Sequence, residues 1–112
     1  MSMFNKRPLR RLVLVASFFV PAWLQAAEVS DTRQAELKHL LIQDCGSCHG
    51  LRMKGGLGPA LTPQDLAGKP KDSLVATVVY GRPGTAMPPW DALLTENEAE
   101  WLIDLLLQGV AP

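Results

Sequence analysis

Cysteine and histidine are scarce in this chain of 112 residues, which contains two of each. Once the two cysteines are used as one pair, none remains for a second metal cluster or a further disulfide. A structural zinc site needs four ligands, and the chain has no second Cys-x-x-Cys pair to supply them. Internal repeats, low-complexity tracts and linkers are also absent, which favours a single small domain.

The first 26 residues have the features of an export signal. A basic start is followed by an apolar stretch from Leu12 to Leu24, which Pro21 interrupts. That stretch is short for crossing a bilayer, and Ala26 provides a small-residue cleavage site. We therefore expect a cleaved secretory signal at 1–26 and a mature domain at 27–112. The alternative is an uncleaved N-terminal anchor.

Cleavage would change the charge balance of the chain. The full sequence has 11 basic and 11 acidic residues, and four of the basic residues lie in the leader, which leaves 7 against 11. A net charge of about −4 argues against binding to nucleic acid or to an anionic membrane surface. It would suit a partner with a basic docking patch. We expect a monomer in the periplasm with no stable membrane association.

The two cysteines stand three apart in Cys45-Gly46-Ser47-Cys48-His49. This spacing is typical of covalent haem attachment, with Cys45 and Cys48 as thioether positions and His49 as an axial iron ligand. Three other interpretations remain open. A thioredoxin-like dithiol would require a βαβ pattern, which the chain lacks, and half a zinc site would require further ligands. A disulfide across so short a loop would gain little entropy.

Helix signals recur through the rest of the chain and predict an all-α domain with three to four helices. We expect them at 30–44, 62–67, 72–80 (or 73–80) and 95–108, with a glycine-rich loop at 50–61 and a proline-rich loop at 81–90. Thr95 and Glu98 form a capping box at the start of the last helix. The valine-rich stretch at 75–80 would also suit a strand, but a lone strand would have no partner.

Apolar spacing predicts which helix faces are buried. Leu37, Leu40 and Leu41 form a stripe that continues to Cys45 and Cys48, so we expect the first helix to present both cysteines inward. His39, between stripe residues, is expected to be an exposed helix histidine. In the last helix the residues expected to point inward are Trp101, Leu102, Leu105 and Leu106.

The sixth position on the iron has one favoured ligand. Of the two methionines after the leader, Met53 is too close to His49 to reach the opposite face of the ring, whereas Met87 lies far along the chain among prolines. Met87 is therefore predicted to be the second axial ligand, with a core-filling methionine as the alternative. The carbonyl of Pro59 is expected to accept the second N–H of His49. Three further candidates for lining haem or binding its propionates are Tyr80, Arg82 and Trp90.

Together these motifs resemble a class I cytochrome c, and the resemblance covers the whole mature chain. It implies an all-α fold around one covalently bound haem c, with the first and last helices crossing near one haem edge. It also implies thioethers at Cys45 and Cys48, axial ligands His49 and Met87, and Pro59 as the hydrogen-bond partner of His49. With both axial positions filled, the resemblance implies an electron carrier rather than an enzyme.

A narrower resemblance rests on three stretches: 58–63, 81–90 and 98–102. They look like the small periplasmic cytochromes encoded beside cytochrome cd1 nitrite reductase in denitrifying bacteria. This implies single-electron delivery to that reductase, with an upstream protein as donor. Two alternatives stay open: a factor in maturation of the d1 haem, and a haem sensor or peroxidase with an open sixth site.

Overall fold

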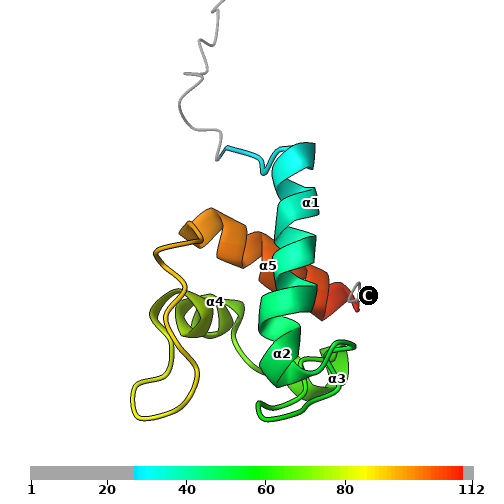
Figure 1. Cartoon of the computed structure of the whole chain (residues 1–112), viewed down its shortest axis with the longest axis vertical. Helices are drawn as coiled ribbons and strands as arrows, with labels where there is room; N and C mark the ends of the chain where they lie inside the picture. Colours follow the sequence, from blue (N-terminus) through cyan, green and yellow to red (C-terminus); the bar gives the residue numbers. More distant parts are fainter. Residues whose placement is uncertain (1–26, 110–112) are drawn as a thin grey trace, which may run out of the picture.

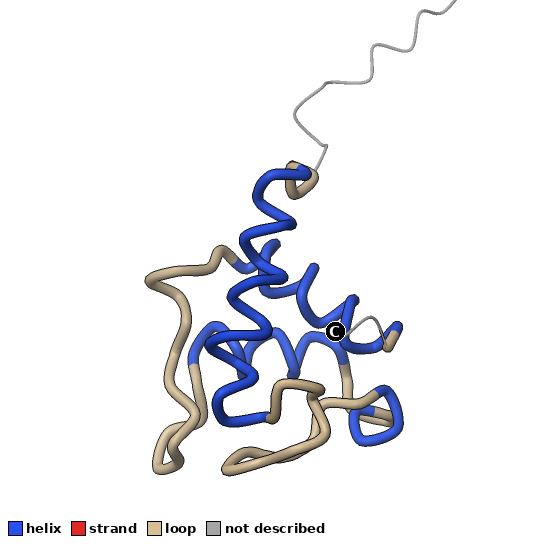
Figure 2. The backbone as a smooth tube through the Cα atoms, turned by 45° about the vertical axis from the view of Figure 1, so that its right-hand side comes forward, coloured by secondary structure: helices blue, strands red, loops and turns tan. Residues whose placement is uncertain are grey.

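The computed structural model describes residues 27–109, so the export signal predicted at 1–26 lies outside the described part. The first helix runs continuously in three parts: α1 (Asp31–Leu40), a π-helical turn η2 (Leu41–Cys45) and α2 (Gly46–His49). Three separate helices follow: α3 (Pro63–Leu66), α4 (Lys71–Tyr80) and α5 (Glu96–Gln108). No strand occurs within residues 27–109, and the all-α prediction is confirmed (Figures 1 and 2).

Side-chain caps fix the starts of three helices where the sequence placed them. The hydroxyl of Ser30 accepts the backbone N–H of Arg33 at the start of α1, and Thr62 does the same for Asp65 in α3. At α5 the predicted capping box is complete, because Thr95 and Glu98 each accept the other's backbone N–H. Gly109 ends α5 in the left-handed conformation that glycine adopts at no steric cost.

The prediction for α4 was one or two residues late, since this helix begins at Lys71 rather than at Asp72 or Ser73. Proline before the first helical residue has a φ suited to a helix start. The Nζ of Lys71 also lies 2.9 Å from a carboxylate oxygen of Glu100 and of Asp104, both on α5. These long-range ion pairs hold the first turn of α4 against α5, and no local sequence pattern predicts them.

The π-helical turn changes which residues of the first helix face the core. The buried residues of this helix are Leu37, Leu41 and Gly46, a spacing of four and then five. A π-turn bonds five residues apart, and the N–H of Gly46 donates to the carbonyl of Leu41. The expected inward stripe is confirmed as far as Cys45, which is half-buried and packs against the core, but it was wrong for Cys48, which is exposed while Gly46 faces inward.

The core lies where α5 meets the other helices. Figure 1 shows α1 crossing α5, with α4 packed along α5 on the other side. In α5 the buried residues are Ala99, Leu102, Ile103 and Leu106. Trp101 and Leu105, which were predicted inward, are only half-buried, so the inward face is rotated slightly from the predicted one. The other buried apolar residues are Leu37, Leu41, Met53, Leu66, Val75, Val79 and Leu94.

Two loops lie at the end of the molecule where α2 ends. The loop at 50–62 and the loop at 81–90 both extend to this end, away from the start of α1, in both views (Figures 1 and 2). The fold therefore brings the Cys-x-x-Cys-His segment and the proline-rich loop to the same end. Within residues 27–109, no helix has the length and apolar character needed to cross a bilayer.

Candidate functional site

The ring of His49 is fixed by one hydrogen bond. Its Nδ1 lies 2.7 Å from the carbonyl oxygen of Pro59. Because a carbonyl oxygen only accepts, Nδ1 carries the hydrogen and donates it, which leaves Nε2 with a free lone pair. This contact is the one that the sequence suggested. It sets the tautomer and the ring orientation that a metal-binding histidine requires.

Gly58 allows the loop to pack this tightly against His49. A Cβ atom at position 58 would lie 2.9 Å from Cε1 and 3.0 Å from Nδ1 of the His49 ring. Such contacts are too short for a carbon atom, so only glycine fits without a shift. The loop is also bonded to the helix end, since the N–H of Gly58 donates to the carbonyl of Cys48 at 2.8 Å and Gly55 to that of His49 at 2.8 Å.

The two cysteines are free thiols with different exposure. Burial, with a smaller contribution from the neighbouring Asp44, raises the pKa of Cys45 to about 11. A dithiol oxidoreductase needs a cysteine whose pKa is lowered, because the thiolate is the nucleophile. A thiol with a raised pKa is not an activated nucleophile, so Cys45 gives the redox-dithiol interpretation no support. Within residues 27–109 no three His, Cys, Asp or Glu side chains cluster as metal ligands, which argues against the zinc interpretation.

The loop that carries Met87 is closed at both ends by backbone hydrogen bonds. At its start the N–H of Arg82 donates to the carbonyl of Met87 at 3.1 Å. At its end the N–H of Trp90 donates to the carbonyls of Val78 and Val79 in the last turn of α4, both at 3.1 Å. The loop is therefore ordered, because it is bonded to itself near its start and to α4 at its end.

Two residues within this loop hold its path, and sequence reasoning missed one of them. The hydroxyl of Thr85 donates to the carbonyl of Arg82 at 2.7 Å and accepts the N–H of Met87 at 3.3 Å. Gly81, the first residue after α4, has a φ of +68°, and a Cβ there would lie 2.7 Å from the backbone of Pro88. The contacts of Thr85 could have been expected from the sequence, because threonine hydroxyls often bond to nearby backbone groups and Thr85 stands two residues before Met87.

The two methionines occupy different environments. Met53 is 1% exposed and belongs to the hydrophobic core, and its φ of +57° is unusual for a residue other than glycine. Met87 is half-buried in the loop at 81–90. Met53 therefore has a structural place already, whereas the thioether of Met87 is not absorbed by the core cluster.

The three remaining candidates differ in how they are held. Trp90 is half-buried and packs against the hydrophobic core, whereas Tyr80 is 67% exposed and Arg82 is exposed. All three lie at the two ends of the loop that carries Met87. Their expected contacts with haem remain predictions, and the packing of Trp90 on the core gives that residue a structural role as well.

These residues fit a covalently bound haem. The two thiols are free, and one imidazole nitrogen of His49 is available while the other is engaged. Glycine at position 58 opens space that a Cβ would fill, directly against the imidazole. A second soft ligand, Met87, lies in an ordered loop at the same end of the molecule. This donor set is that of an iron with one nitrogen and one thioether ligand.

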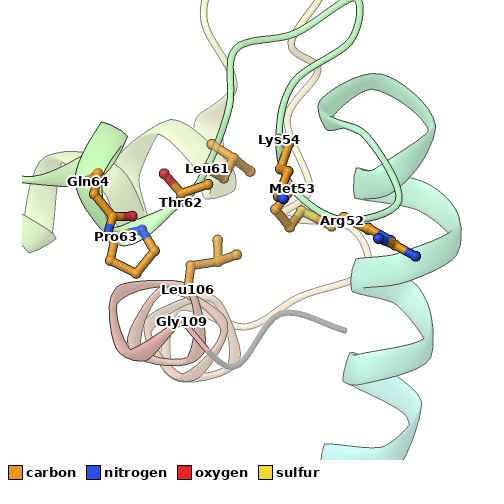
Figure 3. A pocket seen from close by; sticks show the side chains of 9 residues that line it. All are labelled: Arg52, Met53, Lys54, Leu61, Thr62, Pro63, Gln64, Leu106 and Gly109. Carbon is orange, nitrogen blue, oxygen red and sulfur yellow. The ribbon is translucent and has the colours of Figure 1, made fainter.

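A cavity of about 490 Å³ lies away from these donors. Figure 3 shows it between the loop segment Arg52–Lys54, the start of α3 and the end of α5. Its apolar lining includes Met53, Leu61 and Leu106. A second, more open hollow lies between the start of α1 and the acidic face of α5. Neither cysteine lines either cavity, and neither do His49 and Met87.

Comparison with known proteins gives consistent matches. Residues 32–106 match the family described as cytochrome C oxidase, cbb3-type, subunit III. Cytochrome c55X of Pseudomonas aeruginosa is 60% identical over 103 residues, which cover 90% of this chain and 87% of that one. A solved structure of the c-type cytochrome NirC is 64% identical, with a TM-score of 0.73, and covers 74% of this chain and 99% of that one.

A further similar structure is that of a larger protein. Dihydro-heme d1 dehydrogenase NirN, solved in complex with DHE, is 33% identical with a TM-score of 0.60. The match covers 67% of this chain but only 16% of that one. This chain therefore corresponds to one small part of the dehydrogenase.

Proposed function

This chain belongs to the c-type cytochromes, and we propose that it delivers single electrons to cytochrome cd1 nitrite reductase. It has the class I cytochrome c fold and carries covalently bound haem c. The observation that carries the haem-binding part of the proposal is the hydrogen bond between His49 Nδ1 and the Pro59 carbonyl, immediately after Cys-x-x-Cys. It leaves Nε2 as the ring nitrogen that can bind iron. We also propose that the chain is exported to the periplasm of a Gram-negative bacterium and acts there as a monomer.

The residue roles follow from the site. Cys45 and Cys48 form the two thioethers, His49 and Met87 are the axial ligands, and Pro59 orients His49. Tyr80, Arg82 and Trp90 line the haem or bind its propionates. Bound haem supplies a one-electron Fe(III)/Fe(II) couple. The neutral thioether of Met87 favours the reduced state relative to a second histidine, and so raises the reduction potential.

The loops keep these ligands in place during electron transfer. The Met87 loop is closed by hydrogen bonds to α4 and by those of Thr85, and the His49 ring is held by Pro59. Ligands that keep their positions in both oxidation states lower the reorganisation that electron transfer requires. Because both axial positions are filled, no position is left for a substrate, and we propose that the chain has no catalytic activity of its own.

The choice of partner rests on likeness. The similar structures are NirC and a part of the dihydro-heme d1 dehydrogenase NirN, and the motifs resemble cytochromes encoded beside cytochrome cd1 nitrite reductase. Anaerobic mixing of the reduced holoprotein with oxidised nitrite reductase tests delivery directly. A gene deletion distinguishes delivery from d1 haem maturation. Delivery predicts a reductase that contains d1 haem but is starved of electrons, whereas a maturation role predicts a reductase that lacks it.

The first spectroscopic prediction concerns Met87. The oxidised protein is expected to show the far-red sulfur-to-iron charge-transfer band, and Met87→Ala is expected to abolish it because the thioether ligand is lost. Met53→Leu is the matched control, since Met53 is buried in the core, and it should keep the band. If haem is bound and Met87→Ala leaves the visible spectrum unchanged, Met87 is not an axial ligand. The sixth site is then open or filled by another group, and a haem sensor or peroxidase explains the protein better than an electron carrier.

A further inference from the structure

Gly81 is the point at which the two limbs of the Met87 loop meet. It is the only buried residue between positions 81 and 90. A Cβ atom on it would lie 2.7 Å from the carbonyl carbon of Pro88, 2.7 Å from the nitrogen of Pro89 and 2.8 Å from the carbonyl oxygen of Met87. All three neighbours are backbone atoms, and contacts this short would require the backbone itself to move. The returning limb, residues 87–89, therefore passes directly against Gly81.

Backbone hydrogen bonds lie on both sides of this contact. On one side the N–H of Arg82 donates to the carbonyl of Met87 at 3.1 Å. On the other side the N–H of Asp91 donates to the carbonyl of Val79 at 3.2 Å, next to the bonds made by the N–H of Trp90. Val79 is buried in the core, and its helix α4 packs along α5. The backbone of Met87 is thus bonded to the start of the loop and tied through its end to the core.

A second glycine in the same loop separates the two demands made on Gly81. Gly84 lies in the turn that the bond from the Thr85 N–H to the Arg82 carbonyl closes. Its φ of +78° is close to the +68° of Gly81, and both values favour glycine because other residues have a Cβ that clashes there. However, Gly84 is exposed, and a Cβ on it would meet nothing within 4 Å. Only Gly81 combines this backbone conformation with a close contact.

From this contrast we infer that Gly81 is a positioning residue for the sixth iron ligand, because its close contact with the returning limb holds Met87 in place. The inference deepens the proposed function and rests on Met87 being that ligand. A Cβ at position 81 would press on the same Met87 carbonyl that accepts the Arg82 N–H. Site residues must be held within about 0.5 Å of their working positions, so a displaced Met87 backbone would weaken the bond to iron.

Competition by added imidazole measures how firmly Met87 is held in the oxidised holoprotein. Imidazole binds the iron only when Met87 has left it, so its apparent Kd falls as the dissociated fraction rises. Gly81→Ala should bind imidazole about tenfold or more tightly than wild type, and the far-red band should weaken. Gly84→Ala carries the same backbone cost without the clash, and its imidazole Kd should stay within about twofold of wild type.

Met87→Ala gives the upper limit of this effect, because no thioether competes in that variant. Unchanged imidazole affinity in Met87→Ala would refute the assignment of Met87 as a ligand and this inference with it. Unchanged affinity in Gly81→Ala alone would leave that assignment standing and overturn only the inference. Equal gains in the two glycine variants would overturn it too, because strain anywhere in the loop would then suffice to loosen Met87.

A measurement on the wild type decides the matter even if Gly81→Ala does not retain haem. Hydrogen exchange of the Arg82 amide reports whether the two limbs stay together, because this N–H donates to the Met87 carbonyl. If the contact at Gly81 holds Met87, the Arg82 amide should stay protected after imidazole has displaced the thioether. Loss of its protection in the imidazole complex would show that the iron holds the loop, and would overturn the inference.

Discussion

Gly58 sets how closely the loop at 50–62 can approach the imidazole of His49. An alanine there would place its Cβ 2.9 Å from a ring carbon, although the ring is already held by Pro59. Either the ring or the loop must move. We expect Gly58→Ala to destabilise the holoprotein by about 1–3 kcal/mol, the usual range for overpacking a tight site. The midpoint of urea unfolding measures this loss.

Gly46 provides the matched control for this prediction. It is also a glycine beside His49 in sequence, but a Cβ there would meet its nearest neighbours at an ordinary 3.4 Å, and its backbone is helical. Gly46→Ala should therefore be neutral or stabilise the helix by up to about 1 kcal/mol. If both variants unfold at the wild-type midpoint, the close contact at Gly58 does not constrain the site.

Local spacing explains why part of the site could be predicted and part could not. Cys45, Cys48 and His49 follow from a fixed motif, and Pro59 follows from a residue type found near it. The steric role of Gly58 could not be read in the same way, because a glycine in a glycine-rich loop predicts only flexibility. The contact between Gly58 and the ring exists only after the loop has folded back onto α2.

Between elements, one arginine ties α1 to the start of α5. Arg33 Nε lies 2.6 Å from Glu98 Oε1, and its Nη2 donates to the carbonyl of Leu93 at 3.0 Å. The other carboxylate oxygen of Glu98 accepts the N–H of Thr95 in the capping box. The hydrogen bond from Arg33, with the backbone N–H of Thr95 adding to it, holds the pKa of Glu98 below its usual value of 4.5.

Glu98→Gln should remove the charge while keeping one oxygen for the cap. A lowered native pKa means that ionised Glu98 stabilises the fold above its ordinary pKa, and that this contribution is lost as the pH falls through the lowered value. We expect the variant to be less stable than wild type by about 1 kcal/mol at pH 7. The difference should shrink as the pH falls below the ordinary pKa of a glutamate and close once Glu98 is protonated in the folded protein. Urea unfolding across this range measures it.

The exposed Glu96 in the same helix turn serves as the control. Glu96→Gln changes the net charge equally but should cost only a few tenths of a kcal/mol, because Glu96 interacts mainly with the helix dipole. A stability difference for Glu98→Gln that persists unchanged to the lowest pH would show that its charge is not responsible.

Helix ends were predictable because their causes are local. Ser30, Thr62, Thr95 and Glu98 act within three residues of themselves, and the helix starts predicted at 30, 62 and 95 coincide with caps of this kind. The π-helical turn was not predictable in this way, because its extra residue is visible only when Leu41 and Gly46 are both found against the core. One wide turn was enough to bring Gly46 against the core and to leave Cys48 exposed.

At the scale of the whole molecule, the hydrophobic core is small, and four of its eleven buried residues come from one helix. It is centred on α5, whereas His49 at the end of α2 and the two loops that carry Pro59 and Met87 lie together at one end of the molecule. A domain of this size buries a limited fraction of its surface and usually needs a cofactor or cross-link for stability. Haem joined to both loops and to α2 would connect parts of the chain that the core alone does not.

Removing haem should therefore unfold most of this protein. The thioethers keep haem on the chain in the folded and unfolded states alike, but only the folded state buries it and provides both axial ligands, so its presence favours folding. We expect Cys45→Ala/Cys48→Ala, purified without haem, to lose about 20 °C or more in Tm, which corresponds to roughly 3–5 kcal/mol for a domain of this length. Circular dichroism would measure helix content and melting.

Cys45→Ala alone, which keeps one thioether and the haem, should melt between the wild type and the haem-free variant. If the haem-free variant melted cooperatively at the wild-type temperature, the helices would pack without haem, and the cofactor would contribute only the redox couple.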